Sequence, residues 1–415
     1  MDAQNIARLL ELTFELDNDK RKQAEKALSN ARTQHGFSLT LLQILQASGV
    51  NIAIRKSAAV YLKNQCSNKH IGDGKKAIWT YLSEAEKNNV KASIVKACVT
   101  SDRHVMLVMQ DAVANVAFHE YPNNWPQLSS DLIQCIKSRQ PEMMEAALQT
   151  LAEVACKFQF HFGKNRGQIS ALVTSFIPVL AVLLKHLVAQ NSLSAARMMI
   201  NIVRFYCFVT MSDNMVAMEV SPQFLLGWFS LLKQLVDKKL PEAGAGGEPA
   251  GQPTDPDERP KWPWWELKKW CLQACKASFA SCMKAKGSLE EGDTSPKAQL
   301  VNTFVDKIAP QLLQSVLGVL ALRSHRSYCP DDVLFQAMNF LVPSLEAGNV
   351  YLILKPHVAG LIFRVLFAFL CFSDKVWASW RESPEDFVSR EFQVLDDFVD
   401  LRASASYFIA DAAKL

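Results

Sequence analysis

The feature that most constrains this chain is a recurrent pattern of amphipathic helices. Nearly every segment of about ten or more residues carries apolar side chains at the helical period, and almost none alternates as a strand does. In segment 51–66, NIAIRKSAAVYLKNQC, Ala58 and Leu62 fall on one side of a helix. Lys56 and Lys63 fall together on another side. Such a helix has one side too apolar to expose, so it must pack against neighbours.

These helices recur in pairs joined by short turns, with a period of about 40 to 47 residues that is typical of HEAT and armadillo arrays. Each pair buries its apolar side by stacking on the next pair. The predicted fold is therefore all-α, a HEAT-repeat α-solenoid, which is a right-handed superhelix of antiparallel helix pairs. The predicted pairs are 2–16 with 19–33, 37–48 with 51–66, 86–100 with 103–119, 126–138 with 141–158, and 168–188 with 192–211, and later helices start near 222, 263, 296, 331 and 350.

One stretch interrupts the array, LPEAGAGGEPAGQPTDPDERP at 240–260. Its Gly, Pro, Glu and Asp content disfavours helix and offers little to bury, so it is predicted to be a flexible surface insertion. Its GAGG sequence is not a phosphate-binding loop, because no Lys-Ser or Lys-Thr follows it and no strand precedes it. The predicted organisation is repeats at 1–120 and 121–239, an insertion at 240–261, and further repeats at 262–415.

The short stretch EYPNNWPQL, residues 120–128, lies between two predicted helices. Pro122 disfavours continued helix at Tyr121, and Pro126 suits the first turn of the next helix. Tyr121 and Trp125 are then predicted to wedge between successive helix pairs, each burying a large ring. We interpret Tyr121, Pro122, Trp125 and Pro126 as an inter-repeat packing joint.

Composition excludes some classes of function. The 415 residues are 49% hydrophobic and carry a formal net charge of +4. Residues 1–105 hold 16 Lys and Arg against 10 Asp and Glu, a mild basic bias that suits an acidic partner surface. It is far below the dense basic stripes of a dedicated nucleic-acid binder, so no direct nucleic-acid binding is expected. The basic run Lys20, Arg21, Lys22 and Lys26 is either a solvated face or part of a surface that clasps an acidic partner.

Membrane insertion, metal binding and catalysis are not expected. The most apolar window, which starts at Tyr351, contains Lys355, His357 and Arg364, so a buried helix is favoured over a membrane span. The ten cysteines, with no secretory leader, predict reduced intracellular thiols. Two sets of side chains are predicted to belong to the core, the thiols of Cys271, Cys275 and Cys282 and the rings of Trp262, Trp264, Trp265 and Trp270.

No cofactor and no enzymatic activity are predicted either. The histidines are dispersed, and none pairs closely enough with another to form a metal site. Cys156 and His161 are close in sequence, yet no orienting acid or oxyanion turn accompanies them.

Four motifs resemble the importin-β superfamily of nuclear transport receptors. The aromatic-Pro-x-x-Trp-Pro hinge at 121–126 is similar to that of the third repeat of this superfamily. AIRKSAAVYLKNQ, residues 53–65, resembles its second-repeat helix. ERPKWPWWELKKW at 258–270 and VWASWRESPEDFVSREFQVLDDF at 376–398 are similar to segments of the branch that contains importin seven and importin eight. Members of the superfamily are longer, so the array is expected to continue beyond Leu415.

The resemblance implies a receptor that binds Ran-GTP, nucleoporin Phe-Gly repeats and protein cargo, and that works between cytoplasm and nucleus at the nuclear pore. It also implies basic cargoes, such as ribosomal proteins or histones, that are released when Ran-GTP binds. In the superfamily, Ran lies on the inner helices of the first three repeats, here 19–33, 51–66 and 103–119. The candidate Ran-binding residues implied are Lys56, Lys63, Asn64, Asp111 and Asn115.

Three alternatives stay open at this point. An exportin of the same superfamily would gain cargo affinity from Ran-GTP. A helical-repeat scaffold, such as a coat adaptor or a phosphatase regulatory subunit, would share the period without GTP-dependent Ran binding. An enzyme would need a convergent polar pocket that the sequence does not indicate.

Overall fold

The computed structural model describes residues 2–67, 78–159, 162–210, 220–240, 251–290, 292–325, 327–371, 374–392 and 401–415. Every regular element in these ranges is helical, in agreement with the predicted all-α HEAT-repeat class. The chain divides into two compact units, Met1–Val182 with Arg204–Val209, and Leu183–Val203 with Thr210–Leu415. The division falls inside segment 121–239, which the sequence groups as one set of repeats.

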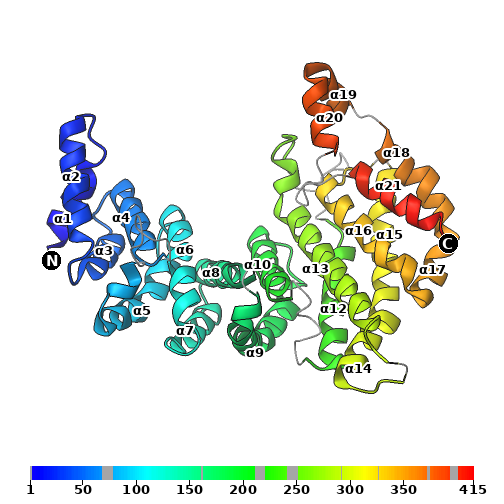
Figure 1. Ribbon diagram of the computed structural model, residues 1–415, viewed down its shortest axis with the longest axis horizontal. Coiled ribbons are helices and arrows are strands. Elements are labelled where there is room, and N and C mark those ends of the chain that lie inside the picture. The colour runs from blue at the N-terminus through cyan, green and yellow to red at the C-terminus, as the bar shows by residue number, and fades with distance from the viewer. Residues whose placement is uncertain are drawn as a thin grey trace. The chain divides into compact units, whose positions relative to one another are not determined.

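The first unit is a stack of helix pairs in which two rows of helices run side by side. Within it α1 packs on α3, α3 on α5 and α5 on α7, while α4 packs on α6 and α6 on α8. Figure 1 shows α4, α6 and α8 next to one another in the second row. The helices are α1 (Ala3–Leu12), α2 (Asn18–Ala31), α3 (Phe37–Gln46), α4 (Ile52–Gln65), α5 (Glu84–Val99), α6 (Arg103–Glu120), α7 (Gln127–Ile136), α8 (Pro141–Gln159), α9 (Phe162–Leu187) and α10 (Leu193–Thr210), with a short 3-10 helix η1 (Ile78–Tyr81); α9 and α10 have residues in both units.

Side-chain caps set where these helices begin. The carboxylate of Asp17 accepts hydrogen bonds from the backbone N–H groups of Asp19 and Lys20 at the start of α2. Asn51 caps α4 through the N–H of Ala53 at 2.8 Å. The predicted helix 2–16 is too long, because α1 already ends at Leu12. The chain must leave helical geometry before Asp17 so that this residue can cap α2.

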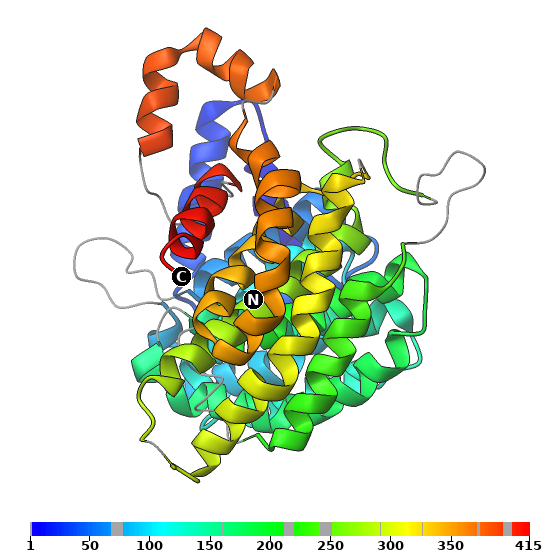
Figure 2. The same ribbon diagram turned by 90° about the vertical axis from the view of Figure 1, so that its right-hand side faces the viewer.

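The second unit repeats the arrangement. In it α12 and α15 form one row, α13, α16 and α21 form the other, and α17 packs on α15 and α16. The long helices coloured green to orange lie side by side in Figure 2. The helices are α12 (Pro222–Asp237), α13 (Pro263–Lys286), α14 (Pro296–Thr303), α15 (Ala309–Ser324), α16 (Asp331–Glu346), α17 (Gly348–Leu361), α18 (Phe367–Leu370), α19 (Asp374–Glu382), α20 (Pro384–Phe392) and α21 (Leu401–Ala412), with a 3-10 turn η2 (Arg259–Lys261) and π-helical turns η3 (Phe304–Ile308) and η4 (Ile362–Leu366).

Aromatic rings fill the core of the second unit. Phe304 contacts Phe229 with ring centroids 4.8 Å apart, and Phe279 contacts Phe340 at 5.1 Å. Each pair joins helices that are distant in sequence, as stacked repeats require. The predicted Trp cluster belongs largely to the core: Trp262, Trp264 and Trp265 are buried and Trp270 is partly buried.

The predicted flexible insertion 240–261 differs from the structure at its C-terminal end. Gln252 is buried, and its Oε1 accepts a hydrogen bond from the indole N–H of Trp265 at 2.9 Å. Arg259–Lys261 form the turn η2 that leads into α13. Composition alone does not reveal this packing, because it depends on a contact with a helix further along the chain. Residues 241–250, including the GAGG sequence, lie outside the described residues, as do residues 393–398 of the second motif in the importin seven and eight resemblance.

Three helical stretches are long and apolar enough to cross a membrane by length and composition alone, Arg166–Leu187, Pro296–Ser324 and Gly348–Leu370. Their apolar side chains also serve packing between helices. Phe176 on the first stretch contacts Phe205 with ring centroids 6.0 Å apart, and Leu354 on the third is fully buried. The absence of membrane insertion stays a prediction.

Candidate partner-binding face of the first unit

Two neighbouring helices of the second row expose a narrow stripe of side chains. On α4, Ala58, Ala59 and Leu62 are completely buried, so positions on the opposite side of the helix face solvent. On α6, burial by α4, α5 and α8 leaves a similar stripe. We call these exposed positions, with the half-buried Lys63 between the two helices, the α4–α6 face; its residues are Lys56, Val60, Lys63, Asn64, Leu107 and Asp111.

An ion pair crosses this face. The ammonium of Lys63 lies 3.5 Å from Oδ2 of Asp111, so two of the candidate residues predicted from sequence meet across the helix boundary. Beside them, Arg55 pairs with Asp102 at 2.5 Å, and its Nε donates to the carbonyl of Leu45 at 2.8 Å. The contact with Asp102 joins α4 to the start of α6, and the contact with Leu45 joins α4 to α3.

Asn115 does not belong to the face. Although it follows Asp111 by one helical turn, it is only 8% exposed, because α6 is covered by neighbouring helices along this turn. Lys56 and Asn64 are exposed, and no hydrogen bond within the described part of the chain holds their side-chain ends. The structure thus brings Lys63 and Asp111 together and leaves Lys56 and Asn64 on the same stripe of α4.

Two members of the face were not predicted from the sequence. Val60 is 37% exposed and Leu107 is 44% exposed, so both are apolar side chains on the solvent side of otherwise amphipathic helices. The sequence does indicate that Val60 is exposed, since it lies away from the buried positions Ala58 and Leu62 on a helical wheel. Exposed apolar groups bordered by charged ones are typical of protein–protein contact sites.

The joint at 120–128 is built as a packing element. Tyr121 is 4% exposed and Trp125 is 1% exposed, and the hydroxyl of Tyr121 lies 2.9 Å from Oγ of Ser129 on α7. The Tyr121–Pro122 peptide bond is cis. Pro126 occupies the N-cap position of α7, and the helix starts at the next residue.

A buried polar cluster at the same joint was not predicted. The carboxylate of Glu120 accepts a hydrogen bond from the indole N–H of Trp79 at 2.8 Å and pairs with the ammonium of Lys91 at 3.4 Å. Lys91 also donates to the backbone carbonyl of Asn124 at 2.8 Å. These contacts fasten the joint to α5 and to η1. Helical periodicity gives no sign of them, because it marks Lys91 and Glu120 only as polar residues.

Seven of the ten thiols are buried, while Cys135 and Cys156 are half-buried and Cys371 is exposed. Cys66, Cys98, Cys271 and Cys282 are fully buried, and burial raises the pKa of each thiol. Across the described ranges, no group of three or more His, Cys, Asp or Glu side chains is placed to hold a metal ion. His161, the neighbour of Cys156 in the sequence, lies outside the described residues, as does His70.

Comparison with known proteins shows which family the N-terminal part of the chain resembles. Residues 24–100, which run from α2 through α5, match the importin-beta N-terminal domain. The importin beta-like SAD2 homolog of Arabidopsis thaliana is 24% identical over 423 residues, an alignment that covers 100% of this chain and 39% of that protein. Importin-8 of Danio rerio is 23% identical over 424 residues, covering 100% of this chain and 40% of importin-8.

A solved structure of the exportin Cse1 in its cargo-free, cytoplasmic state has a TM-score of 0.75 to this chain at 14% sequence identity. The superposition covers 100% of this chain and 42% of Cse1, and it shows a shared fold. The chain spans about two fifths of the length of the curated relatives it matches. Members of this family are transport receptors and not enzymes, in line with the sequence prediction that the chain has no catalytic site. Residues 24–100 thus match the N-terminal domain of the importin-β superfamily, and the whole chain is similar in sequence to importins of that superfamily.

Proposed function

We propose that this protein is a nuclear transport receptor whose α4–α6 face binds Ran-GTP. The observation that carries the proposal is the composition of the face, because its α4 residues fall within the match to the importin-beta N-terminal domain and its apolar members are exposed. Val60 and Leu107 supply an apolar centre, and Lys56, Lys63 and Asp111 supply a charged rim. An apolar centre with a polar rim is the usual anatomy of a protein interface.

The further partners are nucleoporin Phe-Gly repeats and protein cargo, with basic proteins such as ribosomal proteins or histones as the favoured class. One buried Phe contributes only about 1.5–3 kcal/mol before entropy costs. Several such contacts along stacked helices give reversible avidity rather than tight binding. The proposed location is the cytoplasm, the nucleus and the nuclear pore between them.

The proposed switch uses the repeat architecture. Each helix pair contacts only its neighbours, so small rotations between pairs accumulate at low cost. Ran-GTP and cargo that favour different curvatures then weaken each other's binding through a reciprocal coupling free energy. For an importin this coupling releases cargo when Ran-GTP binds.

The test compares Ran loaded with a GTP analogue and Ran-GDP for binding to the 415-residue chain. We expect the GTP-analogue form to bind at least about tenfold more tightly. Equal affinity for both forms, or no binding at all, contradicts the proposal and favours a scaffold outside nuclear transport.

Charge reversal tests the face itself. Lys56→Glu combined with Lys63→Glu is expected to lower the affinity for Ran-GTP about tenfold. The matched control is Lys137→Glu with Arg139→Glu, which makes the same charge change at exposed positions after α7. Circular dichroism should report unchanged helicity for both variants. Full-strength binding by the first variant means that the α4–α6 face is not the Ran site.

A cargo pull-down with and without Ran-GTP then shows whether the receptor imports or exports its cargo. Loss of captured protein on adding Ran-GTP identifies an importin. Gain of captured protein identifies an exportin, the other class in this superfamily.

A further inference from the structure

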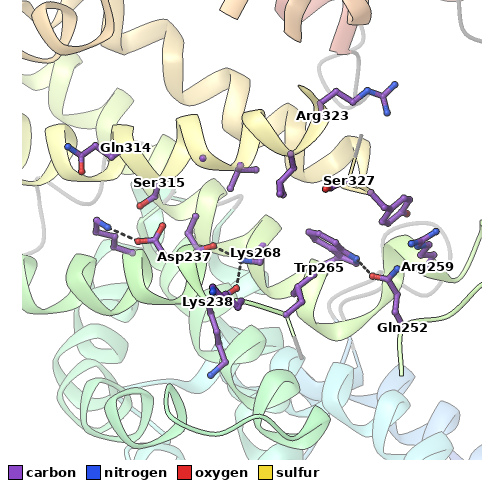
Figure 3. A pocket seen from close by; sticks show the side chains of 18 residues that line it. Asp237, Lys238, Gln252, Arg259, Trp265, Lys268, Gln314, Ser315, Arg323 and Ser327 are labelled. Atoms are coloured by element: carbon purple, nitrogen blue, oxygen red, sulfur yellow. Dashed lines mark hydrogen bonds and ion pairs between the residues drawn. The ribbon is translucent and has the colours of Figure 1, made fainter. Parts of the chain in front are cut away.

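The second unit contains a cavity of about 1230 Å³ that the transport proposal does not use. Its walls are α12 with the residues that follow it, α13, α15, and the short segments around Gln252 and Tyr328. Figure 3 shows Ser315, Lys268 and Gln252 bordering a common space, with the guanidinium of Arg323 directed outward at its edge. Gly318 on α15 contributes to the width of the cavity because it carries no side chain. The volume exceeds that of most small-molecule sites, which hold about 300–1,000 Å³.

The charges that line the cavity are almost all positive. Among the described residues that line it, the one acid is Asp237, which is already paired with Lys233 at 2.6 Å. The cations are Lys233, Lys238, Lys239, Arg259, Lys268 and Arg323. Lys239 and Arg323 are exposed on the rim, and Lys268 is buried in the wall. A concave surface lined by one sign of charge attracts ligands of the opposite sign.

Two buried polar atoms of the cavity can donate hydrogen bonds to a ligand. The indole N–H of Trp265 can only donate, so Gln252 must present its Oε1 to that ring and keep its amide Nε2 for another partner. Gln252 Nε2 and Ser315 Oγ are both buried, and neither has a hydrogen-bond partner within the described residues. Ser315 extends from α15 toward the side of the cavity formed by α12 and α13 (Figure 3).

Lys268 adds a further donor. Its ammonium donates to the backbone carbonyls of Val236 and Lys238. An ammonium has three N–H groups, so one remains after these two contacts. Burial lowers the pKa of Lys268 to about 8, which leaves it a cation at neutral pH. Unpaired buried donors cost free energy, and a ligand with acceptor oxygens removes that cost.

From this geometry we infer that the cavity between α12, α13 and α15 binds an acidic peptide segment of a partner protein. The carboxylates of the peptide meet the rim cations Lys239 and Arg323. Its backbone carbonyls accept hydrogen bonds from Gln252 and Ser315. The donors come from α13, α15 and the segment around Gln252 rather than from one point, so an extended chain suits them better than a small anion does.

A nucleic acid fits less well. Bases would need a free aromatic face on which to stack, yet the guanidinium of Arg259 already lies 3.8 Å from the ring centroid of Tyr328. The indole of Trp265 is buried. The cations are also far fewer than in a surface that follows a phosphate backbone. This inference does not rest on Ran binding or on transport.

The experiment measures binding of a short fluorescein-labelled peptide of Glu and Gly to the 415-residue chain by fluorescence anisotropy. A matched peptide of Gln and Gly is the neutral control, and a single-stranded RNA oligonucleotide is the competing polyanion. We expect the acidic peptide to bind, with affinity that falls as salt is added. Absence of binding, equal binding of the neutral peptide, or tighter binding of the RNA overturns the inference.

Two variants test whether the acidic peptide binds in this cavity. Lys239→Glu with Arg323→Glu should weaken binding of the acidic peptide about tenfold, because both rim charges are reversed. Ser315→Ala should weaken it severalfold by removing one donor. The control, Lys286→Glu with Lys307→Glu, makes the same charge change at exposed positions that do not line the cavity. Equal weakening by the control shows nonspecific attraction and rejects the site.

Measuring the Ran-GTP affinity of the same variants distinguishes failure of this inference from failure of the proposed function. The cavity variants should bind Ran-GTP at full strength. Intact Ran binding with no peptide binding rejects only the acidic-peptide site, and peptide binding without Ran binding rejects only the proposed function.

Discussion

Each unit of this protein buries a lysine, and the two lysines have different partners. Lys91 in the first unit is 5% exposed and meets the carboxylate of Glu120 and a backbone carbonyl. Lys268 in the second unit is 7% exposed and donates to two backbone carbonyls. The first positive charge is balanced by an adjacent negative charge, so its role is structural. The second contributes to a cavity with an excess of positive charge, which suits binding of an acidic ligand.

The largest expected effect comes from breaking the balanced pair. Glu120→Ala leaves the ammonium of Lys91 buried without its carboxylate and the indole N–H of Trp79 without its acceptor. Loss of one partner of a buried ion pair costs about 3–5 kcal/mol. We expect a decrease of that size in the free energy of unfolding of the first unit, measured by urea denaturation together with hydrogen exchange of α5 and α6.

Two further variants control this measurement. Glu142→Ala removes an exposed carboxylate on α8 and should change stability by less than about 0.5 kcal/mol. Glu120→Gln keeps an acceptor for Trp79 but loses the charge, so its effect should be intermediate. If Glu120→Ala is as mild as Glu142→Ala, the cluster does not hold the joint.

A smaller effect is expected from Lys268, and it appears as a pH dependence. The folded-state pKa of about 8 lies below the ordinary value of 10.5, so between these values the unfolded chain binds more protons than the folded chain. Stability linked to Lys268 is therefore complete above 10.5 and is lost as the pH falls to 8. From pH 8 to about pH 9 we expect a gain of about 1 kcal/mol for the native chain relative to Lys268→Met.

Comparison with Lys268→Met is necessary because the buried thiols act in the opposite direction. Burial raises the pKa of Cys271 and of Cys329 to about 12, so alkaline pH favours the unfolded state, in which these thiols ionise more easily. Subtracting the unfolding curve of the variant removes this contribution. A difference that does not change with pH means that the ammonium of Lys268 is not desolvated.

Much of the fold could be predicted because it depends on local patterns. Pro222, Pro263 and Pro296 each occupy the first position of a helix, where proline fits, and the predicted helix starts near 222, 263 and 296 are confirmed. The helix pairs follow from the spacing of apolar residues. The early end of α1 was missed because the pattern continues past Leu12, while the cap at Asp17 decides the boundary.

The candidate sites were less predictable because burial of a polar residue depends on helices that lie far away in sequence. Asn115 matches the helical stripe of Asp111 yet is covered by packing, and Gln252 lies in a segment with a loop-like composition yet is buried. Val60 could have been identified, since an apolar residue on the polar side of a helix is visible in the sequence. Contacts such as Trp265 with Gln252 require the fold itself.

The smallest effect is expected at the exposed ion pair of the α4–α6 face. Lys63 and Asp111 are partly open to water, and exposed pairs contribute about 0.2–1 kcal/mol. A double-mutant cycle with Lys63→Ala and Asp111→Ala should give a coupling energy in that range, which decreases with added salt. A coupling comparable to that of Lys91 with Glu120 would assign the pair to holding α4 against α6. A small coupling, together with weakened Ran-GTP binding by the charge-reversed Lys56 and Lys63 variant, would indicate that these charges serve partner binding. A pair that adds little to folding can exchange its contact for one with a partner.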